Sequence, residues 1–193
     1  MTKQLILSST SPARRELLSR LQIPFTCTAP DIDESPRAGE SIDQLIQRLA
    51  EEKALASAKQ FPDAVIIGAD SVGVINQQIL CKPLTHENAV KILCSVSGNE
   101  VKFLTAVCVY DAHTKQKQIA VEEYDVFFRH LTDAMIENYL AKEDSLQCAG
   151  SFHAEGLGIA LIEKFSGDDY TTLIGLPLIR LTEMLKQAGI LAI

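Results

Sequence analysis

Apolar and polar positions along this chain alternate with two different periods. Short apolar runs bounded by turn residues predict β-strands, and apolar residues recurring every three to four positions predict helices. We expect strands over residues 4–8, 25–29, 64–69, 72–75, 101–111, 118–128 and 158–165. We expect helices over residues 12–21, 42–59, 86–97, 133–141 and 176–188.

The order of these elements predicts an α/β fold. Strands and helices alternate in the first half, whereas two long strands in the second half form a hairpin with His113–Lys115 at its tip. This combination favours a mixed, twisted sheet with flanking helices over a purely doubly wound sheet. A length of 193 residues fits a single domain over residues 1–193, which we expect to form two lobes around a central cleft.

Composition narrows the class of protein. The chain is 47% hydrophobic and 22% charged, which is typical of a globular protein, and its net charge of −7 argues against a nucleic-acid coat. No membrane span or signal peptide is recognised. The cysteines are odd in number and contain no C-x-x-C, so we expect reduced, mostly buried thiols of a cytoplasmic protein and no structural zinc.

The residues after the first strand are typical of an anion site. Ser11 is a natural N-cap and Pro12 a natural first residue of the following helix, whose N-terminus would attract an anion. The hydroxyl of Ser9 and the guanidinium groups of Arg14 and Arg15 add further donors. Ordinary helix capping remains the alternative, because neither a Walker A sequence nor G-x-G-x-x-G is present.

Asp70 follows the apolar strand predicted at 64–69. Ligands of open α/β sheets gather beyond the carboxyl ends of strands, so a working carboxylate is expected here. A capping or turn aspartate is the alternative.

Three other charged residues each allow a functional and a purely structural interpretation. Lys53 falls on the apolar stripe of its own helix, where it either extends to solvent or reaches a buried anion. Lys82 is held extended by the proline after it, or is a surface lysine. Glu34 lies in an acidic loop that either binds a divalent cation or is simply solvated.

Together these residues suit hydrolysis of a triphosphate. General-base assistance contributes about 10²–10⁴ in rate. One cation about 4 Å from a phosphate oxygen contributes about 4 kcal/mol at an effective dielectric near 20. Lysine, arginine and metal charges would therefore dominate catalysis, with Asp70 activating the water.

In this order, the motifs of the chain resemble those of the Maf family of nucleoside triphosphate pyrophosphatases, which are related in fold to the inosine triphosphate pyrophosphatases. The matching stretches are S-x-S-P-x-R-R at 9–15, D-E-x-P-R at 33–37, R-L-A-x-E-K-A at 48–54, G-A-D at 68–70, K-P-L-T at 82–85, Ser97–Gly98, F-R-H-L at 128–131 and I-G-L-P-L at 174–178. The resemblance covers nearly the whole chain.

The resemblance implies hydrolysis to the monophosphate and pyrophosphate with a divalent cation, magnesium or manganese. It implies Asp70 as proton acceptor and, with Glu34, as the acidic residues beside the metal. It assigns phosphate handling to Ser9, Ser11, Arg14, Lys53 and Lys82.

The resemblance also implies that Ala13, Ser71 and Glu155 discriminate the base. The branch acting on dTTP and UTP has Arg, Thr and Gln at these positions, whereas Ala13 and Glu155 are similar to the branch acting on 7-methyl-GTP. A carboxylate suits the positively charged 7-methylguanine. Ser71 departs from that branch, which usually has Gln there.

We therefore expect a cytoplasmic house-cleaning enzyme that hydrolyses 7-methyl-GTP. One alternative is a pyrophosphatase for dTTP, UTP or another modified nucleotide. The other is a nucleotide-binding regulator of cell division, acting in septum inhibition without hydrolysis. The expected partner is a small nucleotide, not a nucleic acid or a membrane, and a homodimer stays open.

Overall fold

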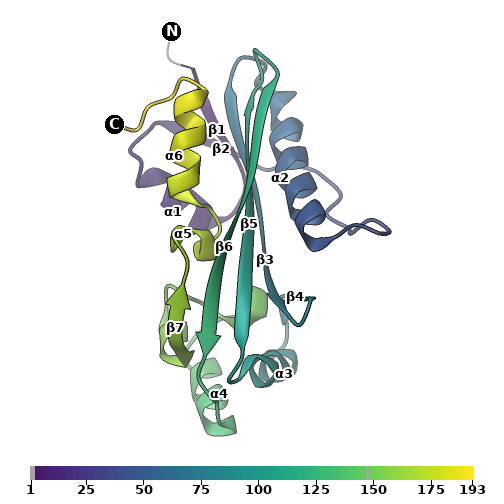
Figure 1. Cartoon of the computed structure of the whole chain (residues 1–193), viewed down its shortest axis with the longest axis vertical. Coiled ribbons are helices and arrows are strands. Elements are labelled where there is room, and N and C mark those ends of the chain that lie inside the picture. The colour runs from purple at the N-terminus through teal and green to yellow at the C-terminus, as the bar shows by residue number, and fades with distance from the viewer. Residues whose placement is uncertain (1–2, 147) are drawn as a thin grey trace. The chain divides into compact units, whose positions relative to one another are not determined.

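The structure is a computed structural model that describes residues 3–146 and 148–193 (Figure 1). Its strands are β1 (Leu5–Ser8), β2 (Phe25–Thr28), β3 (Val65–Ile75), β4 (Gln78–Leu80), β5 (Glu100–Asp111), β6 (Gln116–Phe128) and β7 (Ile162–Ser166). Its α-helices are α1 (Pro12–Ser19), α2 (Ile42–Ala58), α3 (His86–Val96), α4 (Asp133–Leu140), α5 (Thr171–Ile174) and α6 (Leu178–Gln187). Two 3₁₀ segments, η1 (Ala149–Ser151) and η2 (Leu157–Leu161), precede β7.

The strands form one mixed sheet in the order β2-β1-β3-β5-β6-β7, and β4 pairs with β3. β1 runs parallel to both β2 and β3, whereas the β3–β4 and β6–β7 pairs are antiparallel. The expected mixed sheet with flanking helices is therefore confirmed, as is the turn between β5 and β6.

The chain divides into two compact units. The first contains residues up to Ser71, Thr105–Glu122 and Asp169–Ile193. The second contains Val72–Leu104 and Glu123–Asp168. The strands β3, β5 and β6 each contribute residues to both units, and the central cleft stays a prediction.

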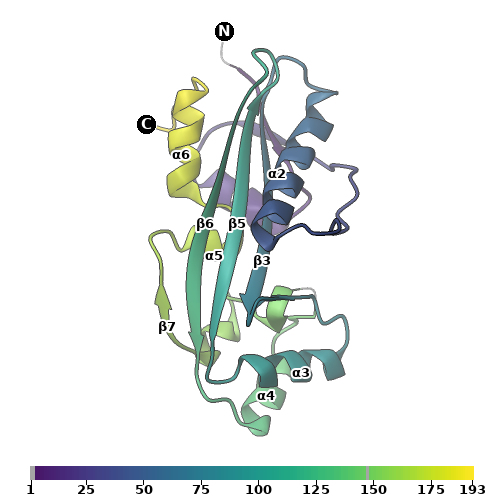
Figure 2. The same ribbon diagram turned by 45° about the vertical axis from the view of Figure 1, so that its right-hand side comes forward.

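In the first unit, helices cover both faces of the sheet, with α2 on one side and α6 on the other (Figures 1 and 2). Odd-numbered residues of β1, β3 and β5 pack against α1 and α6, because side chains alternate between the faces of a strand. This core includes Leu5, Leu7, Leu17, Leu18, Val65, Ile67, Val107, Val109, Leu181 and Leu185.

Helix α2 lies unusually close to β3 at Gly68. A β-carbon built on Gly68 would be 2.1 Å from the carbonyl oxygen of Ala50 and 2.8 Å from the nitrogen of Ala54. The hydroxyl of Ser8 donates to the carbonyl oxygen of Lys53 over 2.6 Å. Gly68 and Ser8 therefore fix the distance between α2 and the sheet. This distance in turn sets the position of the Lys53 side chain.

In the second unit, an aromatic cluster lies beside the helices α3 and α4. The Phe152 ring is 6.2 Å from that of Phe103 and 5.3 Å from that of Phe128, centroid to centroid. These tilted and edge-on contacts hold the 3₁₀ segment η1 against β5 and β6.

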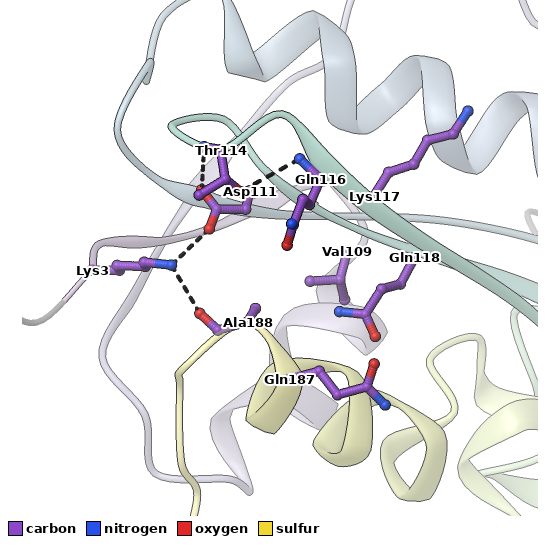
Figure 3. A pocket seen from close by; sticks show the side chains of 9 residues that line it. All are labelled: Lys3, Val109, Asp111, Thr114, Gln116, Lys117, Gln118, Gln187 and Ala188. Atoms are coloured by element: carbon purple, nitrogen blue, oxygen red, sulfur yellow. Dashed lines mark hydrogen bonds and ion pairs between the residues drawn. The ribbon is translucent and has the colours of Figure 1, made fainter.

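A half-buried ion pair closes the far end of β5 in the first unit (Figure 3). Asp111 accepts from the Lys3 ammonium at 2.6 Å and from two backbone N–H groups of the following turn, at His113 and Thr114. Lys3 also donates to the carbonyl oxygen of Ala188, after α6. Lys3 thus joins the residues before β1 and those after α6 to the hairpin.

Several expected element boundaries were wrong. Strands predicted at 64–69 and 72–75 are one strand, β3, because Asp70 and Ser71 continue the extended backbone instead of ending it. The last helix begins at Leu178, two residues later than expected, because Gly175 is left-handed (φ 114°) and ends the short helix α5. The strand expected at 158–165 starts at Ile162, after η2. Strand β4 and helix α5 were not anticipated.

The expectation of mostly buried thiols is also wrong. All five cysteines are free, but Cys27, Cys81 and Cys94 are exposed. Only Cys108 is fully buried, and desolvation raises the pKa of its thiol to about 12. Among the helices of the described residues, none combines the length and the apolar run that crossing a bilayer needs.

Candidate active site

Lys53 joins two carboxylates in the first unit. Its ammonium nitrogen lies 2.7 Å from Oδ1 of Asp70 and 2.9 Å from Oε1 of Glu34. Lys53 and Asp70 are buried, with 6% and 9% of their surface exposed, whereas Glu34 is exposed. The lysine predicted on an apolar stripe therefore reaches a buried anion instead of extending to solvent.

The alternation of β3 explains why Asp70 meets Lys53. Asp70 points to the same face of the sheet as Gly68, the face on which α2 is packed. β1 pairs with β3 only as far as Ser8, opposite Gly68, so the sheet is open beside Asp70. The carboxylate thus lies at the carboxyl edge of the parallel strands although β3 itself continues.

A clasp between Arg48 and Glu40 holds the loop that carries Glu34. Nε and Nη2 of Arg48 donate to the two oxygens of Glu40, over 2.6 and 2.9 Å, and Nη2 also donates to the carbonyl oxygen of Ser35. The bond to Arg48 lowers the pKa of Glu40 to about 2 and raises the pKa of Arg48. This bidentate pair joins the acidic loop to the helix that carries Lys53.

The turn between β1 and α1 has the predicted capping geometry. The Ser11 hydroxyl accepts from the backbone N–H of Arg14 at 3.3 Å, and Ser9 accepts from that of Ser11 at 3.1 Å. Pro12 is the first helical residue and Ala13 is half-buried in the first turn. These residues form the start of α1 as the sequence predicted.

The guanidinium group of Arg14 is held by hydrogen bonds to Gly175 and Ser71. Its Nε donates to the carbonyl oxygen of Gly175 at 2.8 Å, and its Nη2 donates to Oγ of Ser71 at 3.0 Å. Burial lowers the pKa of the guanidinium, but the negative charges of Asp70 and Glu34 oppose this shift. The interaction with both carboxylates places Arg14 in the same electrostatic environment as Lys53.

Lys82 and Glu155 belong to the second unit. Both are exposed. Lys82 lies between β4 and α3, next to a backbone contact between Cys81 and Gly150. Glu155 lies in the turn between η1 and η2.

The turn that carries Glu155 is held by another carboxylate of the second unit. Glu143 accepts from Nδ1 of His153 at 2.8 Å and from the backbone N–H of Leu157 at 2.6 Å, and the bond to His153 lowers its pKa. These contacts bracket Glu155 on both sides along the chain.

Of the expected site residues, three are in direct contact in the first unit: Asp70, Lys53 and Glu34. The other expected residues of this unit lie on neighbouring elements: Ser9, Ser11, Ala13, Arg14 and Ser71. Sequence reasoning missed the anchoring roles of Arg48 and Glu40, and it missed Thr105, whose hydroxyl bonds to Ser71. Thr105 gave a signal, since it is a polar residue inside the apolar run of β5.

Two carboxylates that share one ammonium define a position for a cation. Across residues 3–146 and 148–193, no group of three or more His, Cys, Asp or Glu side chains forms a metal cluster. Asp70 and Glu34 are two carboxylates that share a partner, and a hard ion such as magnesium takes one or two protein carboxylates and completes its shell with water and phosphate oxygens.

The comparisons with known proteins agree along nearly the whole chain. The family described as Maf-like protein matches residues 4–188. A protein of Methylobacillus flagellatus named 7-methyl-GTP pyrophosphatase is 53% identical over 186 residues, 96% of this chain and 97% of its own length. A protein of the same name from Nitrosococcus oceani is 51% identical over 185 residues, 96% of this chain and 93% of its own length.

Likeness to solved structures is more distant. The Ham1 protein of Staphylococcus aureus has a TM-score of 0.46 at 13% identity, over 66% of this chain and 73% of that chain. This level of similarity identifies neither a ligand nor an activity. The family match and the two relatives, by contrast, show that the chain belongs to the Maf family.

Proposed function

We propose that this chain hydrolyses a nucleoside triphosphate to its monophosphate and pyrophosphate, with 7-methyl-GTP as the preferred substrate. The observation that carries the proposal is the pair of carboxylates, Asp70 and Glu34, that share the Lys53 ammonium at the open edge of the sheet. The relatives that are 51–53% identical bear the name of this activity.

Phosphate binding is assigned to the cations and hydroxyls of the first unit. An ammonium group has three donors, and within the described residues Asp70 and Glu34 take two of those of Lys53. The third is available to a phosphate oxygen. Arg14 likewise uses Nε and one N–H of Nη2 within the protein, which leaves further guanidinium donors for phosphate. Ser9 and Ser11 complete this assignment in the first unit, and phosphate binding by Lys82 stays a prediction.

Asp70 and Glu34 are the residues that would hold a divalent cation. When bound, a magnesium or manganese ion would neutralise phosphate charge and acidify water. Asp70 accepts a proton from the attacking water while the anhydride bond between the α- and β-phosphates breaks. If the water attacks the α-phosphorus, pyrophosphate leaves with the electrons of that bond and the water oxygen stays on the monophosphate. If it attacks the β-phosphorus, the monophosphate leaves with those electrons and the water oxygen stays on the pyrophosphate.

The proposal is tested with a panel of nucleotides: 7-methyl-GTP, GTP, dTTP and UTP, each with magnesium and with manganese. Pyrophosphate and orthophosphate are measured separately. Pyrophosphate released fastest from 7-methyl-GTP supports the proposal. Preference for dTTP or UTP overturns the base assignment alone, and release of orthophosphate overturns the reaction class.

Glu155→Gln is expected to lower kcat/KM for 7-methyl-GTP about 10-fold or more, because a charge-assisted hydrogen bond contributes about 1.5–3 kcal/mol. The same substitution should change kcat/KM for UTP less, since uracil carries no positive charge. Steady-state kinetics with both nucleotides measures the difference. Glu163→Gln, at an exposed glutamate of β7, is the matched control. Equal losses for both nucleotides would show that Glu155 does not read the base.

A further inference from the structure

Thr105 is a buried polar residue to which the mechanism above gives no task. It lies in β5, has 0% of its surface exposed, and interrupts an apolar run. A buried hydroxyl destabilises a protein unless it is hydrogen-bonded, and valine has nearly the same shape. Packing alone therefore gives no reason for threonine at this position, and the reason must lie in its hydrogen bonds.

The Thr105 hydroxyl lies within hydrogen-bond distance of two other oxygen atoms. Its Oγ1 is 2.9 Å from Oγ of Ser71 and 2.8 Å from the carbonyl oxygen of Thr172. Because threonine is branched at Cβ, its χ1 angle is restricted and the hydroxyl direction is well defined. Thr105 thus connects the strand β3 to the short helix α5 at a fixed geometry.

Ser71 passes this restraint to Arg14. Ser71 Oγ accepts from Nη2 of Arg14 on one side and shares a hydrogen bond with Thr105 Oγ1 on the other. A serine side chain alone has free choice among rotamers, but two hydrogen bonds at one oxygen restrict it to a single position. The guanidinium therefore meets a fixed acceptor at Nη2.

A second fixed acceptor lies at Nε of Arg14. Gly175 ends α5 in the left-handed region and directs its carbonyl oxygen to Nε at 2.8 Å. A β-carbon there would lie 3.3 Å from Ser71 Oγ and 3.4 Å from Arg14 Nε. The glycine of the I-G-L-P-L stretch therefore leaves room for both partners while supplying the acceptor.

We propose that Thr105 is a positioning residue, which acts through Ser71 to hold the Arg14 guanidinium in the orientation that binds the phosphates. The proposal rests on the proposed function for the identity of the ligand, but the restraint on Arg14 is a property of the free protein. Two acceptors, at Nε and Nη2, fix the plane of the guanidinium and leave its remaining N–H groups directed elsewhere. In this chain Ser71 thus supplies the acceptor that orients Nη2 of Arg14.

The first experiment follows Arg14 in the free protein. The Nε–H resonance of Arg14, assigned by its loss in Arg14→Lys, is expected to exchange slowly with solvent because its donor is engaged. Thr105→Val should speed this exchange about tenfold. Thr105→Ser, which keeps the hydroxyl, should restore most of the protection.

Thr172→Val is the matched control. The Thr172 hydroxyl has no hydrogen-bond partner within the described residues, and the side chain is buried. The same change of threonine to valine should therefore leave the exchange of the Arg14 Nε–H unaltered. If Thr105→Val does not fold, Ser71→Ala interrupts the same connection at a half-buried position.

Kinetics supply the second readout. Thr105→Val should raise the KM for the nucleotide about tenfold, with kcat changed less than about threefold, because a restraint on a binding group is lost. In an Arg14→Met background the same substitution should raise KM less than about twofold, since the residue it positions is gone.

Unchanged Arg14 exchange in both Thr105→Val and Ser71→Ala would overturn the proposal, as would equal effects of Thr105→Val and Thr172→Val. A wild-type protein that releases no pyrophosphate from any nucleotide would instead contradict the proposed function. The exchange measurement would still decide the role of Thr105.

Discussion

Asp70→Asn is expected to lower kcat for pyrophosphate release by about 10²–10⁴-fold, because an amide cannot accept the proton of the attacking water. Nucleotide KM should change less, since the phosphate-binding groups Lys53 and Arg14 remain. Steady-state kinetics with manganese and 7-methyl-GTP measures both constants. The melting temperature of the variant shows whether it is folded.

The chain offers a close control in Asp111. Asp111 is as buried as Asp70, at 5% exposed, and it too pairs with a lysine, at 2.6 Å from Lys3. Asp111→Asn should lower stability while kcat stays within about twofold of wild type, because distant sites act independently. An equal loss of turnover in both variants would mean that Asp70 acts on the fold and not on the reaction.

Much of the fold follows from local pattern. The apolar run of β1 and the capping residues Ser41 and Gln44 determine where a strand and a helix begin, and both agree with the structure. The predicted break after residue 69 was wrong for a non-local reason. Asp70 and Ser71 are polar because Asp70 pairs with Lys53 of α2 and Ser71 accepts a hydrogen bond from Arg14. The pairing of β3 with its neighbouring strands keeps the backbone extended through both residues.

The same distinction applies to the candidate site. Lys53 was a candidate because a cation on an apolar helical stripe either extends to solvent or reaches a buried anion, and only the contact to Asp70 decides between the two. Thr105 and Arg48 act through contacts that local pattern does not specify: Thr105 is 34 positions from Ser71, and Arg48 reaches back along the start of α2 to Glu40. Their roles became visible only when the distances between side chains were known.

Lys53→Met is expected to have two opposite effects. Hydrolysis should fall about 10²–10³-fold, because one preorganised donor to the phosphates is lost. Binding of Mn²⁺ to the nucleotide-free protein should strengthen about tenfold or more, because the ammonium that now lies 2.7 and 2.9 Å from Asp70 and Glu34 competes for the same position. Calorimetric titration with Mn²⁺ measures the second effect without any turnover.

Lys3→Met separates this competition from a general change in charge. Lys3 pairs with the buried Asp111, so its replacement alters net charge and frees a carboxylate in the same way. It should nevertheless leave the rate of hydrolysis within about twofold of wild type, because distant sites act independently. It should not strengthen Mn²⁺ binding, because Asp111 has no second carboxylate among its described partners. If Mn²⁺ binds Lys53→Met no better than wild type, Asp70 and Glu34 do not share a cation position, and the metal must be held elsewhere.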